Sequence, residues 1–456
     1  MRAIATDRMR GSSLWFDSRL NVQLVTGLPL GTTRLRTTRL AAAAVLLASP
    51  ACRTRTGPQD VELRFWAMGA EGEAVQQMIP EFERTHPGIR VRVQQMPWTA
   101  AHEKLLTGFV GDATPDITQM GNTWVPEFQA LGALAPLGDL VKGSAVVDST
   151  DYFAGVWRTN VVDDTLYGLP WYVDTKLIYY RKDLLAAAGV TAPPRSWAEW
   201  REAMVKAQKA GKAKWGILLP TNEWPQIVAL GLQEGAPLLR DGGRYGGFSD
   251  PRFARAFHFY VSLYKDGIAP TVSSNEISNL FQEFEKGTFA MFISGPWQVG
   301  ELRKRLPASM QDAWAAMPLP SPDGSDYPGT SLAGGSSLSM FRASKHKKVA
   351  WQLIEFLSEP AQQAKFVALT GDLPARESAW KLAKLDADPQ TSAFLTQLRD
   401  VTPTPKVPEW ELIATRVFET VERVVRGRAT EKDGLAALDA DVDRILEKRR
   451  WLLAHR

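Results

Sequence analysis

The chain has 456 residues, 45% of them hydrophobic and 23% charged, which is enough to bury the cores of about three domains. No run approaches the roughly 20 consecutive apolar residues of a membrane-spanning helix. A single cysteine excludes an internal disulfide framework and a cysteine-rich metal cluster, and the five histidines are scattered, so we expect no metal and no cofactor.

The excess of positive charge lies in the N-terminal segment. The chain has 54 basic and 50 acidic residues, and residues 1–51 hold seven arginines against two aspartates. The remainder therefore has 47 basic and 48 acidic residues. A nearly neutral body lacks the charge that attracts nucleic acids, so no nucleic-acid partner is expected.

Residues 1–51 have the features of an export signal. Three arginines precede a short apolar stretch, and small residues follow it up to a lone cysteine: Arg34, Arg36, Arg39, Leu40 to Leu47, Ala48, Ser49, Ala51 and Cys52. The working protein is therefore expected to begin near residue 52, outside the cytoplasm, and the true translation start to lie downstream of Met1. Cys52 is a candidate for acylation in the manner of a bacterial lipoprotein, although Ser49 and Pro50 depart from that motif. The alternative is ordinary cleavage nearby.

After a polar tether over 52–60, the chain alternates between strand and helix patterns. Residues 61–66 alternate in polarity, 73–85 have helical spacing of apolar residues, and 89–93 alternate again. Strand, helix and strand in this order form the unit of a parallel sheet with crossover helices. A helix over 100–110, a strand over 116–120 and a helix over 124–131 follow.

A second series of elements starts at the strand 177–181. Helices are predicted over 197–209, 226–233, 251–265, 277–286, 299–305, 348–357, 360–369 and much of 409–450, with strands over 216–219, 289–293 and 337–341. No internal repeat or low-complexity linker separates the two series. Two α/β lobes with the chain crossing between them fit this order.

The mature chain resembles the extracellular solute-binding proteins of bacterial ABC importers, in the sugar-binding group that includes maltose- and trehalose-binding proteins. The resemblance rests on the order and spacing of many short motifs over 60–450. They are Trp66, Phe82-Glu83, His86-Pro87-Gly88-Ile89, Pro115-Asp116-Ile117, Asn122, Trp124, Leu131-Gly132, Leu134 to Leu137, Tyr167 to Tyr172, Asp174, Tyr179 to Asp183, Gly287 to Met291, Ser294 to Trp297, Gly334-Gly335 and Leu373 to Arg376.

The resemblance implies a periplasmic-binding-protein-like α/β fold, with two lobes joined by crossing hinge segments and a ligand cleft between them. The expected N-terminal lobe holds 60–174 and 336–385, and the C-terminal lobe 175–335 and 386–450. The implied function is capture of a sugar, such as maltose or trehalose, in the periplasm and its delivery to the permease subunits in the inner membrane. We expect a monomer that touches the membrane only through a lipid anchor.

The aromatic content supports a carbohydrate ligand. Fifteen of the sixteen tryptophans follow the leader. Aromatic faces stack on the C–H faces of sugars, while carboxylates and amides bind the hydroxyl groups. Several of these tryptophans follow a predicted strand or open a predicted helix, and open α/β sheets bind ligands beyond the carboxyl ends of their strands.

Trp297 and Asp174 are the first candidates for ligand contact. Trp297 follows Gly295-Pro296 after a buried strand, and the resemblance makes it a sugar-stacking residue rather than a core residue. Asp174 lies beside two aromatic residues at a crossover, where its carboxylate can accept hydroxyl hydrogen bonds or cap a turn.

Asn122, Trp124 and Arg376 are further candidates. The resemblance makes Asn122 a hydroxyl-binding residue. Trp124 could equally contact the ligand or pack in the core. Arg376 lies in a loop after Leu373-Pro-Ala, and its fork of N–H donors suits adjacent hydroxyl groups, with a solvated surface position as the alternative.

The remaining candidates have weaker support. Gly334 and Gly335 permit close backbone approach to a ligand or serve a hinge. Four other residues are candidates for the site, for packing or for a cap: Tyr172, Glu71, Trp224 and Trp410. Trp98 and Trp351 are expected in the core.

Two alternative functions remain open from the sequence. A glycerol-3-phosphate-type binding protein of the same family would need several converging cations, of which Arg376 is the only candidate. An exported carbohydrate-active enzyme would need two carboxylates about 5–9.5 Å apart, which only the tertiary structure can supply. Serine-hydrolase, zinc-protease and phosphate-loop motifs are absent, so we expect a binding protein and no catalytic residue.

Overall fold

The computed structural model describes residues 60–210 and 213–455. The export signal, Cys52 and all but the last residue of the tether lie outside the described residues. Among the described helices none is long and apolar enough to cross a membrane. Nor does the described part of the chain bring together three or more His, Cys, Asp or Glu side chains that could hold a metal ion.

The first sheet has six strands in the order β15-β6-β14-β3-β1-β2. Its strands are β1 (Val61–Met68), β2 (Ile89–Met96), β3 (Ile117–Gly121), β6 (Leu169–Asp174), β14 (Gly334–Met340) and β15 (Leu373–Pro374). The neighbours β2, β1 and β3 are parallel, whereas β14 runs antiparallel to β3 and β6. The predicted strand–helix–strand unit is thus confirmed at residues 61–96, and the sheet is mixed.

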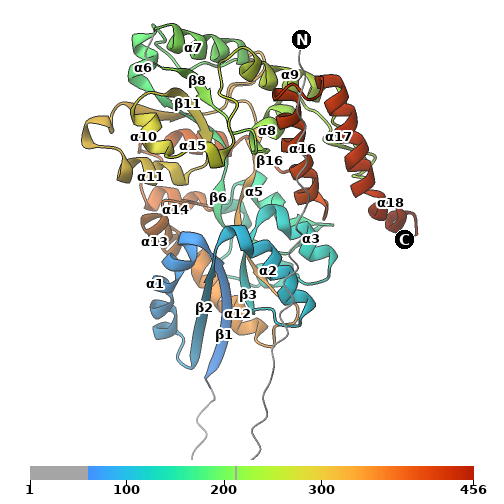
Figure 1. Ribbon diagram of the computed structural model, residues 1–456. Coiled ribbons are helices and arrows are strands. Elements are labelled where there is room, and N and C mark those ends of the chain that lie inside the picture. The colour runs from blue at the N-terminus through green and yellow to red at the C-terminus, as the bar shows by residue number, and fades with distance from the viewer. Residues whose placement is uncertain (1–59, 211–212, 456) are drawn as a thin grey trace, which may run out of the picture. The chain divides into compact units, whose positions relative to one another are not determined.

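Helices cover both faces of this sheet (Figure 1). Within the described residues, eight helices pack on the first sheet or on one another beside it: α1 (Gly69–Thr85), α2 (Trp98–Val110), α3 (Val125–Ala130), α4 (Gly138–Lys142), α5 (Ala154–Thr159), α12 (Lys347–Ser358), α13 (Pro360–Thr370) and α14 (Glu377–Leu382). The helical spacing in α1 buries Val75, Met78 and Phe82 against the strands, as the sequence pattern predicts.

The second sheet has four strands in the order β12-β7-β11-β8. They are β7 (Leu177–Arg181), β8 (Trp215–Leu218), β11 (Phe289–Ser294) and β12 (Trp314–Met317). Its helices are α6 (Lys182–Ala187), α7 (Trp197–Lys209), α8 (Pro225–Gln233), α9 (Pro251–Lys265), α10 (Leu280–Glu285), α11 (Trp297–Arg305) and α15 (Ser392–Leu398). Ser196 caps the N-terminus of helix α7, and its hydroxyl accepts from the backbone N–H of Glu199 in a capping box.

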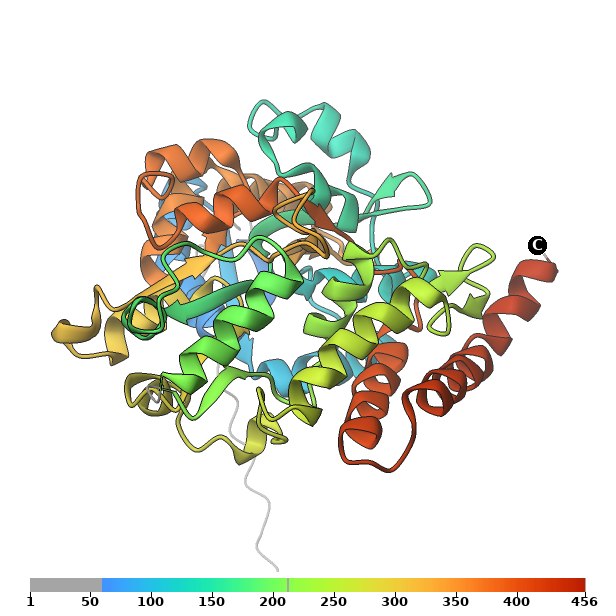
Figure 2. The same ribbon diagram turned by 90° about the horizontal axis from the view of Figure 1, so that it is seen from above.

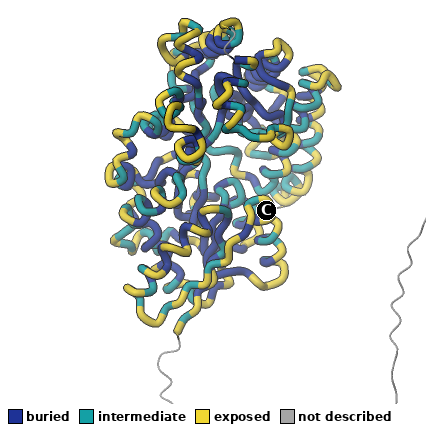
Figure 3. The backbone as a smooth tube through the Cα atoms, turned by 60° about the vertical axis from the view of Figure 1, so that its left-hand side comes forward, coloured by how far each residue is buried: buried dark blue, intermediate teal, exposed yellow. Residues whose placement is uncertain are grey.

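The helical tail belongs with the second sheet. It forms α16 (Trp410–Val425), α17 (Glu431–Ile445) and α18 (Glu447–Ala454). Both α16 and α17 pack against α9, and Figure 2 shows the three red helices along that side. Their apolar residues share one core with those of α7, α8 and α9. In Figure 3 the buried segments lie in the interior and the exposed segments on the outside.

Two α/β lobes therefore form the fold that the sequence predicts. The chain passes from β6 to β7 through Thr175 and Lys176, and it returns through β13 (Ser331–Leu332), which pairs in parallel with β16 (Val401–Thr402). The residue bounds of the lobes stay a prediction. The remaining short elements are β4 (Val161–Val162), β5 (Thr165–Leu166), β9 (Leu239–Arg240), β10 (Tyr245–Gly246) and the 3₁₀ turns η1 (Asn122–Trp124), η2 (Ser149–Asp151), η3 (Ser274–Glu276) and η4 (Ala308–Met310).

Sequence patterns missed the interior strand β6 of the first sheet and the edge strand β12 of the second. β6 contains Pro170, which usually argues against a sheet interior, yet the strand pairs with β14 and β15 on either side. β12 is only four residues long and carries two alanines, so its pattern is weak. β14 starts at Gly334 rather than Ser337, because pairing with β6 extends it over two glycines of low strand propensity.

Candidate functional site

A cavity of about 620 Å³ is lined by residues from both lobes. Polar and aromatic side chains reach it from the ends of β3, β6 and β11, from the start of β14 and from the beginnings of several helices. Nine of the eleven candidate ligand-binding residues line it: Glu71, Asn122, Trp124, Tyr172, Asp174, Trp224, Trp297, Gly334 and Gly335. Strand ends at one edge of each sheet thus converge on one site, as open α/β sheets arrange them.

The wall formed by the N-terminal lobe fixes a carboxylate at the start of α1. Tyr172 donates its hydroxyl to Glu71 Oε1 over 2.7 Å, and Trp98 Nε1 donates to the same oxygen over 3.2 Å. Gln119 Nε2 donates to the Tyr172 hydroxyl over 3.2 Å. Burial raises the pKa of Tyr172 well above its usual value, with the nearby Glu71 charge as a second cause, so the phenol remains a donor.

Trp124 is held in an aromatic cluster on the same wall. Its ring meets Trp98 edge-on with centroids 5.7 Å apart, and His102 lies 5.1 Å away. His102 Nε2 lies 2.6 Å from Glu127 Oε2, and that hydrogen bond raises the pKa of His102. This packing leaves Trp124 as a rigid apolar surface beside the cavity.

Asn122 lines the cavity, but its side chain is already engaged. Its Nδ2 donates to Thr159 Oγ1 over 2.8 Å, and its Oδ1 accepts from Ser337 Oγ over 3.0 Å. The residue is 5% exposed. These contacts make Asn122 a support for the turn that carries Trp124.

Trp297 is the most exposed aromatic residue of the cavity wall. It is 36% exposed and begins α11 immediately after Gly295 and Pro296. An ideal Cβ on Gly295 would lie 2.0 Å from ring carbon Cζ3 of Trp297 and 2.6 Å from Asp174 Oδ1. The absence of a side chain at residue 295 therefore allows the indole ring and the carboxylate to lie next to each other.

Gly335 allows strands β14 and β6 to approach each other closely. Its φ is +132°, and an ideal Cβ there would lie 2.2 Å from the carbonyl oxygen of Tyr172. Gly334 and Gly335 pair with Asp174 and Val173 in the β14–β6 ladder. The two glycines therefore bring β14 tightly against the strand that carries Asp174.

The cavity wall is acidic. Five carboxylates and one ammonium group line it: Glu71, Asp174, Glu301, Asp372, Glu411 and Lys176. Burial raises the pKa of Asp372 well above its usual value, with the Glu71 charge as the second cause, and burial also raises the pKa of Glu411. Thr123 Oγ1 donates to Glu411 Oε1, which joins η1 of one lobe to α16 of the other.

Comparison with known proteins identifies the family. The family model described as bacterial extracellular solute-binding protein matches residues 67–364. The chain belongs to this family. The solved structure of the sugar-binding protein MalE from Xanthomonas citri is 47% identical, with a TM-score of 0.83 over 87% of this chain and 100% of that one.

Two curated relatives bind different solutes according to their names. The diacetylchitobiose-binding protein DasA of Streptomyces coelicolor is 26% identical over 73% of this chain and 76% of its own length. The sn-glycerol-3-phosphate-binding periplasmic protein UgpB of Rhizobium meliloti is 23% identical over 84% of this chain and 92% of its own length.

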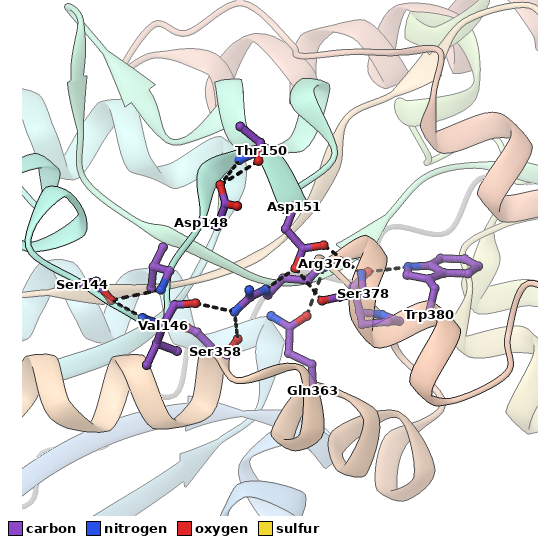
Figure 4. Close-up of polar contacts among 12 residues, drawn as sticks. Ser144, Val146, Asp148, Thr150, Asp151, Ser358, Gln363, Arg376, Ser378 and Trp380 are labelled. Carbon is purple, nitrogen blue, oxygen red and sulfur yellow. Dashed lines mark hydrogen bonds and ion pairs between the residues drawn. The ribbon is translucent and has the colours of Figure 1, made fainter.

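Arg376 of this solute-binding protein does not lie at the cavity, contrary to the expectation from its loop. Its Nε donates to Asp151 Oδ2 over 2.6 Å, and its Nη1 donates to the carbonyl oxygens of Val146 and Ser358, each over 2.9 Å (Figure 4). The residue is 6% exposed. Its donors satisfy groups inside the N-terminal lobe, so Arg376 is a structural residue.

Trp410 also lies outside the cavity lining. It is 1% exposed and meets Trp224 edge-on with centroids 5.5 Å apart. Trp410 is therefore a core residue that supports Trp224. For Trp98 the expectation is wrong in the other direction. The sequence analysis expects it in the core, whereas it lines the cavity.

Several lining residues escape sequence reasoning. Thr123 lies one residue after Asn122, and Lys176 lies two residues after Asp174, so proximity to those candidates could have indicated both. Asp372 lies directly before the Leu373-Pro-Ala-Arg motif, which likewise could have drawn attention to it. Glu301 and Glu411 give no such signal, because each is an acidic residue on an amphipathic helix.

Proposed function

We propose that this solute-binding protein captures a short neutral oligosaccharide, with a disaccharide such as maltose or trehalose as the first choice. The observation that carries the proposal is the exposed ring of Trp297 next to the Asp174 carboxylate in a cavity between two lobes. A stacking face beside a hydroxyl acceptor is the combination that sugar rings require. The 620 Å³ volume lies within the range of roughly 300–1,000 Å³ of small-molecule sites.

The charge of the cavity disfavours glycerol-3-phosphate and other anionic ligands. Phosphate recognition relies on converging cations, and Lys176 is the one basic side chain among the lining residues. That ammonium is paired with Asp174, and four further carboxyl groups face the same space, of which burial makes Asp372 and Glu411 harder to ionise by raising their pKa. A dianionic ligand would be repelled, whereas a neutral polyol can use the carboxylates as hydrogen-bond acceptors.

Binding is proposed to stabilise a closed state. A ligand that contacts both lobes holds them together, which is the hinge closure of two-domain binding proteins. The closed monomer would then dock on the permease subunits of an ABC importer and release the sugar, with ATP hydrolysed by other subunits.

Titration calorimetry against a panel of ligands tests the proposal. The panel contains maltose, trehalose, diacetylchitobiose and glycerol-3-phosphate, with the purified chain starting at residue 60. We expect saturable one-to-one binding of at least one sugar and no heat from glycerol-3-phosphate. Tight binding of the phosphate ester would overturn the preference for neutral ligands.

Incubation of the same preparation with maltose, trehalose and longer glucans tests the enzyme alternative. A binding protein leaves each sugar intact over hours at high protein concentration. Release of glucose that disappears when Asp174 or Glu71 is replaced by the amide would instead assign a glycosidase.

The cellular location is proposed to be the periplasm, with the mature chain anchored through a lipid on Cys52. The support is the leader pattern of residues 34–52 together with membership of an extracellular family. Expression of the full chain and of Cys52→Ala, followed by separation of membrane and soluble fractions, tests the anchor. Acylation predicts that only Cys52→Ala is found in the soluble fraction.

A further inference from the structure

A second cavity of about 710 Å³ adjoins the first one. Residues of the C-terminal lobe line it, including Asn222, Phe281 and Arg305. Four residues line both cavities and so form their common wall: Lys176, Trp224, Pro225 and Trp297. A change in any of these side chains alters the space on both sides.

Lys176 lies where a ligand of the proposed function would bind. Its Nζ is 4.5 Å from the centroid of the Trp297 ring, over the face of the indole. The same atom donates to both carboxylate oxygens of Asp174, over 3.1 and 2.9 Å. One ammonium group thus covers the aromatic face and engages the carboxylate that together would bind a sugar ring.

The backbone of Lys176 is held by hydrogen bonds that do not involve its side chain. Ser331 Oγ accepts from the Lys176 N–H over 3.1 Å and donates to the Lys176 carbonyl over 2.9 Å. Ser331 is fully buried at the crossing between the lobes. The Lys176 side chain, 13% exposed, hydrogen-bonds only Asp174 among the described residues. It can therefore change rotamer without disturbing the crossing segment.

We propose that Lys176 is a specificity-determining residue that competes with the ligand for Trp297 and Asp174. The inference rests on the proposed function, because it concerns the same stacking face. A sugar ring cannot stack on that face while the ammonium covers it, so binding moves Lys176 toward the second cavity. Breaking the contact of Lys176 with Trp297 and Asp174 costs free energy, which reduces the net binding free energy of the ligand. Ligands that do not use both Trp297 and Asp174 fail to displace the lysine.

Affinity measurements on Lys176→Ala test the competition. Removal of the side chain frees both Trp297 and Asp174, so the sugar that binds wild type is expected to bind roughly 3- to 30-fold more tightly. Lys176→Arg keeps a cation for both partners and should stay within about threefold of wild type. Lys365→Ala is the matched control, since it removes a lysine paired with Glu81 outside the cavity lining and should leave the affinity unchanged.

A spectroscopic measurement follows the ammonium itself. Reductive ¹³C-methylation keeps the charge of lysine, and methyl groups over an indole face are shifted upfield by its ring current. The Lys176 signal, assigned by its loss in Lys176→Arg, should be shifted upfield in the free protein and should return to an ordinary value when the sugar saturates the site.

The outcomes separate this inference from the proposed function. Weaker sugar binding by Lys176→Ala, or an upfield methyl signal that persists at saturation, would show that Lys176 holds the ligand or stays in place, and either result overturns the competition. A wild-type chain that binds no sugar of the panel overturns the proposed function instead.

Discussion

Two ion pairs of this protein look alike in composition and differ in what surrounds them. Arg376 pairs with Asp151 inside the N-terminal lobe, and Lys176 pairs with Asp174 at the cavity. The side-chain exposures are similar, at 7% and 19% for the first pair and 13% and 27% for the second. Exposure alone therefore does not distinguish the pair inside the lobe from the pair at the cavity wall.

Hydrogen-bond capacity separates them. Arg376 also donates to two carbonyl oxygens, and Asp151 also accepts from the backbone and hydroxyl of Ser378 (Figure 4). Within the described part of the chain, the Lys176 ammonium contacts only its partner carboxylate and the Trp297 ring. A pair whose groups are saturated by the protein holds the fold together, whereas a pair with unused capacity at a cavity wall can exchange its contacts for those of a ligand.

Arg376→Ala should give the largest effect. It leaves the Asp151 carboxylate and two carbonyl groups without their donor, so the free energy of unfolding is expected to fall by about 3–5 kcal/mol. The folded fraction should bind sugar with unchanged affinity. Urea denaturation and calorimetry on one preparation check both statements. A stable variant that has lost sugar affinity would place Arg376 in the site and remove the contrast between the two pairs.

Trp297→Ala changes the surroundings of the Lys176–Asp174 pair at the cavity. Loss of the stacking face should cost about 2–4 kcal/mol of binding, or roughly a 30- to 1,000-fold fall in affinity. Thermal stability without sugar should stay close to wild type, because the ring is 36% exposed. Trp451→Ala, which removes a 60% exposed tryptophan of α18, is the control and should change neither quantity. An unstable variant with intact affinity would assign Trp297 to the core.

Gly295→Ala tests the contact between Trp297 and Asp174. The added methyl group would meet both side chains at 2.0–2.6 Å and push them apart. Overpacking of this kind costs about 1–3 kcal/mol, which we expect mainly as an affinity loss of about 5- to 150-fold. Gly138→Ala is the matched control, since an ideal Cβ there has no neighbour within 4 Å. Equal affinities for both variants would contradict the geometry of the site.

Asp372→Asn should give the smallest effect, seen in the pH dependence of stability. Burial and the Glu71 charge raise the pKa of Asp372 in the folded state. Between the ordinary and the raised pKa the folded protein holds a proton that the unfolded chain has released, so this residue lowers stability as pH rises. The amide removes that loss, and the variant should be more stable than wild type at pH 7 and equal to it near pH 4.

The control for Asp372→Asn is Asp386→Asn, which changes an exposed carboxylate. Urea denaturation at both pH values compares the two variants with wild type. A pH profile of Asp372→Asn that parallels that of Asp386→Asn would show that Asp372 is ionised in the fold and that its burial has no energetic consequence.

Local patterns in the sequence predict many of the helices and strands, and several of the strand ends that line the cavity. Period-2 and helical spacing predicted β7, α7 and α9 to the residue, because those segments bury one face and their caps or breakers are explicit. The position of Trp297 at the cavity follows from Gly295-Pro296, which comes directly after the buried strand β11. Such features depend on neighbours within a few residues, which the sequence displays directly.

Which polar residues line the cavity depends on long-range packing that no local pattern displays. Asp151 lies 225 residues from Arg376, and Glu411 lies 288 residues from Thr123, so no local pattern shows that these groups meet. An arginine in a loop has the same sequence signature whether it faces solvent, a sugar or a buried aspartate. Its role follows from the groups that satisfy its hydrogen bonds, and long-range packing of the two lobes supplies those groups.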